Sequence, residues 1–197
     1  MSNQHRLSSP PLHPDSFERN RLRKMALDFL KGKIPDHTGV KVDQYYYMTE
    51  AEMESCHGWI QWAFPIDTVS PYNGECGNYW RLDEKILRAY KYGSGLYQTR
   101  MRLTEQYLKT VGIDLYAHTN AIKFFQVVDS PYNHHMKRLS RVMLHLMITG
   151  NKMDARQLYK TLILDLVMRD PAAFQQKTIA YWGSIVLEFD DIAKERL

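Results

Sequence analysis

The stretch from Ser130 to Gly150, SPYNHHMKRLSRVMLHLMITG, indicates the fold class because it contains the start, the apolar face and the end of one helix. Pro131 stands at the first helical position, where the N–H that proline lacks has no partner within the helix. Leucines and methionines then recur every three or four residues, and Gly150 is the residue type that commonly ends a helix. We therefore predict a helix from Ser130 to Thr149.

The residues that follow extend this pattern. Asp154 begins a second predicted helix that reaches about Arg169, and Asp170 with Pro171 begins a third that reaches about Glu188. Helices joined by such short connections pack as antiparallel neighbours. The sequence therefore predicts an all-α protein with an antiparallel C-terminal helical array.

Helix signals also fill the earlier part of the chain, so we expect about six to eight helices in a single domain over residues 15–197. Thr49 and Glu52 form a capping box, which marks the start of one of these helices. Residues 1–14, MSNQHRLSSPPLHP, contain consecutive prolines and no periodicity, so we predict a disordered or wrapping arm. The remaining predictions are helices at 15–32, 50–63, 83–90 and 96–111, and a long loop at 67–80. Residues 113–128 fit either a helix or a strand, and we favour a helix.

The composition limits the class of protein. The chain has 197 residues and a net charge of +4, a weaker bias than the strongly basic surface of a typical nucleic-acid binder. No apolar stretch of the signal-peptide type follows Met1, so we expect no signal peptide, and no apolar run reaches the roughly 18 to 20 residues that cross a bilayer. We therefore expect a cytoplasmic protein without a transmembrane segment. Phosphate-binding loops and catalytic serine motifs are absent from the sequence, so we predict no cofactor.

Cys56, His57 and Cys76 are the candidates for a metal site. Structural zinc takes four ligands, usually in pairs of short spacing, and neighbours on a helix point about 100° apart. We therefore expect no metal, and we assign the cysteines to packing and to a loop. Three acidic residues on the same predicted helix are expected in solvent, because their two-residue spacing spreads them around it: Glu50, Glu52 and Glu54.

A polar stripe on the predicted helix from Ser130 has two interpretations. His134, Arg138, Arg141 and His145 fall within about 60° of one another on a helical wheel. The first interpretation is the solvated face of an amphipathic helix. The second is an anion-binding stripe, because two guanidinium groups flanked by imidazoles suit contacts to phosphate or carboxylate. Apolar neighbours on the same helix make partial burial with polar partners a further possibility.

The segment HGWIQWAFP, residues 57–65, raises the same question. His57 and Gln61 are four residues apart and share a helical face. These two side chains either tie buried groups together or form a ligand pocket with the arginine stripe. The aromatic residues, Trp59, Trp62 and Phe64, are expected in the core, and an exposed patch that stacks on bases is the alternative.

Two stretches of this chain resemble one known family. HGWIQWAFP is similar to the H-x-Y-I-Q-W-L-F-P signature of the opioid growth factor receptor conserved region, and HHMKRLSRVM, residues 134–143, is similar to its H-N-x-x-R-I-T-R-I-L stretch. The resemblance covers about residues 20–167. The sequence departs from the pattern at Gly58, Trp59, Ala63 and His135. The matching positions are His57, Ile60, Gln61, Trp62, Phe64, Pro65, His134, Arg138 and Arg141.

The resemblance implies a bare domain of the microbial type, which acts by binding. Vertebrate members are described as enkephalin receptors associated with nuclear membranes and growth control, whereas no activity is established for the microbial domains. We expect one polar site for an anionic small molecule or peptide, formed by His57, Gln61, His134, Arg138 and Arg141.

Other functions stay open. A protein-interaction module would use an apolar patch such as Gln44–Met48, and its motif residues would be purely structural. An enzyme, which we consider less in keeping with the sequence, would need His57 or His134 beside a carboxylate in a pocket. Nucleic-acid binding would use the basic segment Arg19–Lys24.

Overall fold

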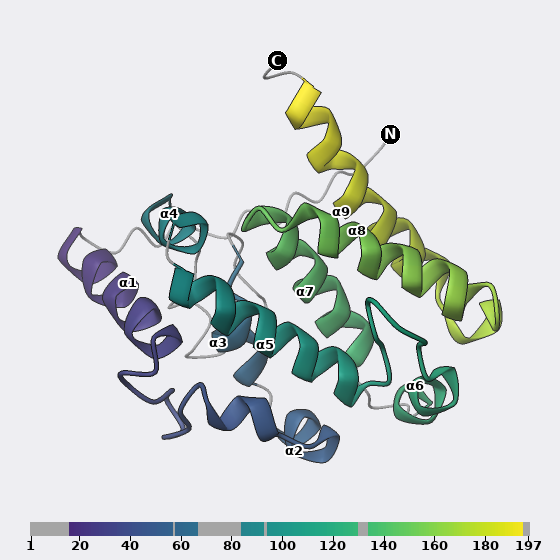
Figure 1. Cartoon of the computed structure of the whole chain (residues 1–197), viewed down its shortest axis with the longest axis horizontal. Coiled ribbons are helices and arrows are strands. Elements are labelled where there is room, and N and C mark those ends of the chain that lie inside the picture. Colours follow the sequence, from purple (N-terminus) through teal and green to yellow (C-terminus); the bar gives the residue numbers. More distant parts are fainter. Residues whose placement is uncertain (1–15, 57, 67–83, 93, 130–133, 195–197) are drawn as a thin grey trace, which may run out of the picture.

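The computed structural model describes residues 16–56, 58–66, 84–92, 94–129 and 134–194, and every regular element in these ranges is helical (Figure 1). The all-α prediction is therefore confirmed. The predicted arm at 1–14 and the predicted loop at 67–80 both lie wholly outside the described residues. In chain order the elements are α1 (Ser16–Leu30), η1 (Gln44–Tyr47), α2 (Glu50–Ser55), α3 (Trp59–Ala63), α4 (Glu84–Tyr92), α5 (Ser94–Thr110), α6 (Ala121–Val128), α7 (His135–Ile148), α8 (Lys152–Thr161), η3 (Leu162–Val167), η4 (Pro171–Ala173) and α9 (Gln176–Lys194).

Helix α7 is buried on nearly every side. Its predicted apolar face includes Leu139 and Met143, which are fully buried, and its other sides carry His135, Arg138 and His145, which are buried as well. Figure 1 shows α7 in the middle of the fold, and it contacts both α8 and α9. A helix buried on most sides must provide a partner for each polar group that it carries into the interior. The polar stripe of α7 therefore needs hydrogen-bonding partners from other segments of the chain.

Helices α8 and α9 lie side by side and run in opposite directions, as expected from their short connection (Figure 1). Both predicted helices in this region are less regular than the sequence suggested. α8 continues from Leu162 to Val167 as a π-helical segment. The helix expected to begin at Pro171 is instead a 3-10 turn followed by extended backbone at Phe174, whose buried ring stacks on Phe124 with 6.1 Å between the ring centroids. The anchoring of this ring accounts for the interruption before α9.

The single helix predicted to span α2 and α3 is interrupted, so that prediction is wrong. Cys56 has an extended conformation with φ −97° and ψ 90°, and the helical backbone resumes at Trp59. The break allows the indole N–H of Trp59 to donate to the carbonyl of Met53 at 2.8 Å. A Cβ atom at Gly58 would lie only 2.7 Å from the ring of His37, so the residue type permits this close approach. The close approach of His37 comes from outside this segment, and helical periodicity does not reveal it.

Local start and stop signals are confirmed where the structure describes them. The Thr49–Glu52 capping box is present at the start of α2. Gly112 and Gly150 have φ of 82° and 86° beyond the ends of α5 and α7, in the left-handed region that glycine adopts most easily. The expected start of α7 at Pro131 lies outside the described residues. Within the described ranges, no helix is both long enough and apolar enough to cross a membrane.

Candidate functional site: the polar stripe of helix α7

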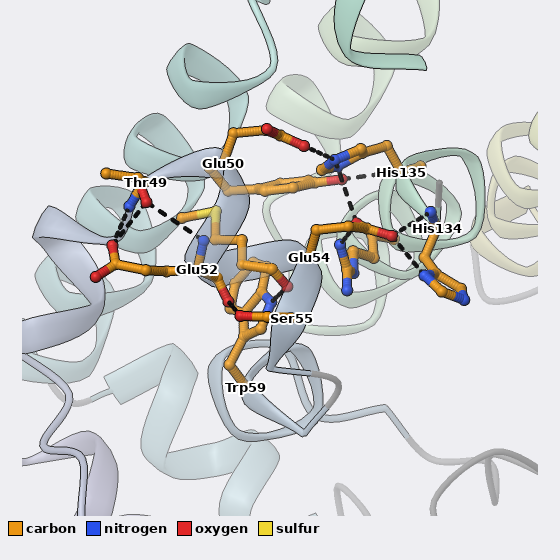
Figure 2. A network of polar contacts seen from close by, with 11 residues as sticks. Thr49, Glu50, Glu52, Glu54, Ser55, Trp59, His134 and His135 are labelled. Atoms are coloured by element: carbon orange, nitrogen blue, oxygen red, sulfur yellow. Dashed lines mark hydrogen bonds and ion pairs between the residues drawn. The ribbon is translucent and has the colours of Figure 1, made fainter. Parts of the chain in front are cut away.

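Glu54 is the centre of a polar network that joins the end of α2 to the start of α7 (Figure 2). One carboxylate oxygen accepts from the backbone N–H of His134 at 3.0 Å and lies 2.5 Å from its ring Nδ1. The other oxygen accepts from the Arg138 guanidinium, with which it forms an ion pair. The side chain of Arg138 is 4% exposed, that of Glu54 is 25% exposed and that of His134 is 41% exposed. The network therefore extends from the interior to the surface.

The charges in this network are set by burial and by Arg138. Burial alone would raise the pKa of Glu54, but the hydrogen bond from His134 and the charge of Arg138 outweigh it and hold the pKa below its usual value. His135 is fully buried, and burial together with the charge of Arg138 lowers its pKa, although Glu54 and Glu50 act in the opposite direction. At neutral pH the network therefore contains an ionised Glu54 against Arg138 and a neutral His135.

His135 connects a third helix, α5, to the network around Glu54. Its Nε2 lies 3.4 Å from carboxylate oxygens of both Glu50 and Glu54. On the other side of the ring, the hydroxyl of Tyr107 on α5 lies 3.4 Å from Nδ1 and donates to the His135 carbonyl at 3.3 Å. Helices α2, α5 and α7 thus meet at His135, which is not among the site residues predicted from the sequence.

The second half of the stripe binds the end of the HGWIQWAFP segment. Nε of Arg141 donates to the carbonyl of Phe64 at 2.8 Å, and Nδ1 of His145 lies 2.6 Å from the carbonyl of Pro65. Burial lowers the pKa of Arg141 to about 10. Burial also lowers the pKa of His145 to about 3, against the hydrogen bond to Pro65, which raises it. The polar stripe therefore follows the chain from Glu54 to Pro65 in order.

The predicted site residues have the following places in the structure. His134, Arg138 and Arg141 all contact the chain between α2 and the end of α3. Gln61 is 7% exposed on α3, within the same segment. His57 lies outside the described residues, so the convergence of all five on one site stays a prediction. The interpretation of the stripe as a solvated face is wrong, because Arg138 and His145 are buried.

The expectation for Glu54 is also wrong. Its side chain is largely covered, because it is the acidic partner of the buried Arg138. The sequence contained one signal for this: a buried arginine requires an acceptor, and Glu54 lies three residues before the start of the HGWIQWAFP motif. His134 beside Glu54 is the arrangement that an enzyme would need, but the carboxylate is shared with Arg138, and this fits a role in joining helices.

The aromatic residues of the motif belong to the core, as expected. Trp59, Trp62 and Phe64 are buried, so these rings form no exposed patch for stacking on bases. Trp59 packs between Phe64 and Tyr107, with ring centroids 6.2 Å and 5.4 Å away, and the Arg138 guanidinium lies 5.9 Å from its ring. Trp62 donates its indole N–H to Nδ1 of His37 at 3.0 Å. The motif anchors helix packing through both its rings and its carbonyls.

A metal site finds no support in the described ranges, where no group of three or more His, Cys, Asp or Glu side chains is arranged to hold an ion. Cys56 is a partly exposed free thiol there, whereas His57 and Cys76 lie outside those ranges.

No protein-family model, no curated protein and no solved structure matches this chain. Membership of the opioid growth factor receptor conserved-region family therefore stays a prediction from the two motifs.

Proposed function

We propose that this domain binds an anionic group, such as a phosphate or a peptide carboxylate, at Arg141. The observation that carries this proposal is the contrast between the two arginines of the stripe. Arg138 has the carboxylate of Glu54 as its partner, whereas Arg141 forms no ion pair with any described acidic residue and uses Nε to contact only the neutral carbonyl of Phe64. A guanidinium with little solvation and no acid beside it is a strong site for a bidentate anion.

The other residues of the predicted site have distinct parts in this proposal. Arg138 and His134 position α7 through Glu54, which leaves Arg141 one turn further along the helix. We expect His57 and Gln61 to contact the ligand, because they precede Phe64 on the same segment. The two segments in contact here are those that carry the resemblance to the opioid growth factor receptor conserved region, and this supports a binding role for the pair.

The proposal is tested by thermal unfolding of the wild type, Arg141→Gln and Arg141→Lys with phosphate and with peptides that have a free or an amidated C-terminus. A ligand at about 100 times its dissociation constant stabilises the folded protein by roughly 2.7 kcal/mol, which is easily measured. We expect the wild type to be stabilised, Arg141→Gln not to respond and Arg141→Lys to respond weakly. The matched control is Lys137→Gln, which removes the same charge from an exposed position on α7. An equal response of Arg141→Gln and wild type contradicts the proposal.

A second candidate function is protein interaction through η1. Tyr47 is 76% exposed there, beside an open groove. An exposed tyrosine at the edge of a groove is typical of interaction surfaces. A Tyr47→Ser variant tests it in a pull-down from cells, because loss of a specific partner supports this function and an unchanged set of partners contradicts it. The groove is lined by Val40, Gln44, Tyr47, Met48, Glu52, Ser55 and Cys56.

A further inference from the structure

Three buried polar atoms make no hydrogen bond within the described chain, and they belong to neighbouring residues. They are Oη of Tyr90 on α4, Nε of Arg100 on α5 and Nε2 of His145 on α7. The Tyr90 and His145 rings meet edge to face with 5.2 Å between their centroids, and the Arg100 guanidinium lies 5.8 Å from the Tyr90 ring. Buried polar groups without partners are rare in native proteins, so each of the three requires an explanation.

The cluster carries positive charge without a matching carboxylate. Arg100 is 3% exposed, donates to the Thr149 carbonyl at 3.1 Å and forms no ion pair with the described residues. The charge of Asp154 raises the pKa of Arg100, but the Asp154 carboxylate already accepts hydrogen bonds from Tyr116 and Asn151. The charges of Arg100 and Arg141 both lower the pKa of His145. Buried cations are nearly always paired, so this charge favours an anion over a water molecule.

The three atoms differ in what they offer a ligand. Nε of Arg100 can only donate a hydrogen bond. The Tyr90 hydroxyl is neutral because burial raises its pKa, and it can donate as well. Nε2 of His145 is an acceptor: the carbonyl of Pro65 can only accept, so Nδ1 carries the proton of the neutral ring. A fitting ligand therefore accepts two hydrogen bonds and donates one.

We propose that Tyr90, Arg100 and His145 bind a small oxyanion that carries a hydroxyl group, namely hydrogen phosphate or bicarbonate. The oxyanion accepts from Arg100 and Tyr90 and donates its O–H to His145, while its charge offsets that of Arg100. Halides, nitrate and sulfate offer no hydrogen to His145 at neutral pH, so the site discriminates against them. This inference rests on the proposed function in one respect: Arg141, one turn from His145 and partly exposed, would hold the remaining oxygens of the same anion.

The test compares isosteric anions on four proteins at pH 7 and constant ionic strength. Phosphate is compared with sulfate, and bicarbonate with nitrate, because each pair shares its shape but differs in the hydroxyl group. The shift in melting temperature gives apparent affinities for wild type, Tyr90→Phe, Tyr97→Phe and Arg141→Gln. Tyr90→Phe removes only a hydroxyl that makes no hydrogen bond within the described chain, so we expect it to fold. Tyr97→Phe is the matched control, since that ring also lies against Arg100 but is exposed.

We expect phosphate or bicarbonate to bind wild type at least about tenfold more tightly than its isostere, and Tyr90→Phe to lose about tenfold in affinity while Tyr97→Phe does not. Preference for phosphate over bicarbonate, or the reverse, identifies the oxyanion. Equal stabilisation by sulfate and phosphate that Arg141→Gln abolishes and Tyr90→Phe leaves intact overturns this inference and keeps the proposed function. Loss of affinity in Tyr90→Phe with none in Arg141→Gln supports this inference and overturns the proposed function. No stabilisation by any anion overturns both, and a buried water is then the partner of the three atoms.

Discussion

Replacement of Glu54 by glutamine tests whether one carboxylate joins α2 to α7. The change keeps the size of the side chain but leaves the charge of Arg138 buried without an acidic partner, and it weakens the acceptor for His134. Loss of one partner of a buried ion pair costs about 3 to 5 kcal/mol. Because the Glu54 side chain is 25% exposed and glutamine still offers an oxygen, we expect a smaller loss, about 2 to 3 kcal/mol.

The assay is urea unfolding followed by tryptophan fluorescence, with the melting temperature as a second measure. A loss of about 2 to 3 kcal/mol in a chain of this length lowers the melting temperature by roughly 4 to 12 °C. The double variant Glu54→Gln/Arg138→Met should recover part of the loss, because methionine carries no charge. Glu52→Gln is the control, since glutamine can also complete the capping box of α2. If Glu54→Gln and Glu52→Gln both remain within about 0.5 kcal/mol of wild type, the buried ion pair does not hold these helices together.

Two further predictions concern pH and backbone conformation. The folded-state pKa of His145 is about 3, below the value of about 6.5 for an exposed histidine. As the pH drops, this histidine is therefore protonated in the unfolded chain before it is protonated in the folded protein. The free energy of unfolding should fall between about pH 6.5 and pH 3, by at most about 4 kcal/mol. His145→Gln should make this fall shallower in urea titrations at several pH values, and a profile unchanged from that of exposed His118→Gln refutes the assignment. Gly112→Ala should destabilise the protein by about 1 to 3 kcal/mol, because φ is 82° and the new Cβ would lie 2.8 Å from a backbone oxygen. Gly95→Ala, where a Cβ has open space in α5, should be neutral or stabilising by up to about 1 kcal/mol, and calorimetry that ranks the two variants equally contradicts this reasoning.

The features that sequence predicted well are those that a short stretch of chain determines. The capping box at Thr49 and the glycine beyond α5 are set by residues within one or two turns, so their geometry follows from local hydrogen bonds and from φ. The apolar face of α7 is likewise a property of spacing along one helix. The periodicity of apolar residues was therefore enough to predict the all-α fold class.

The features that sequence missed depend on contacts between distant segments. Glu54 and Arg138 are 84 positions apart, and no local pattern shows that the carboxylate turns toward α7 instead of water. The break before Trp59 likewise accommodates the ring of His37, which lies 21 positions before Gly58 in the chain. The wheel of α7 grouped the correct polar residues, but a wheel cannot distinguish a face covered by another segment from a face in solvent.

Calorimetric titration of phosphate into the protein at pH 7 is the most direct test of anion binding at Arg141. We expect one saturable site per chain in the wild type, the same site in Lys137→Gln and no saturable heat in folded Arg141→Gln. A saturable site that survives unchanged in Arg141→Gln, or the absence of saturable heat in the wild type, would contradict it.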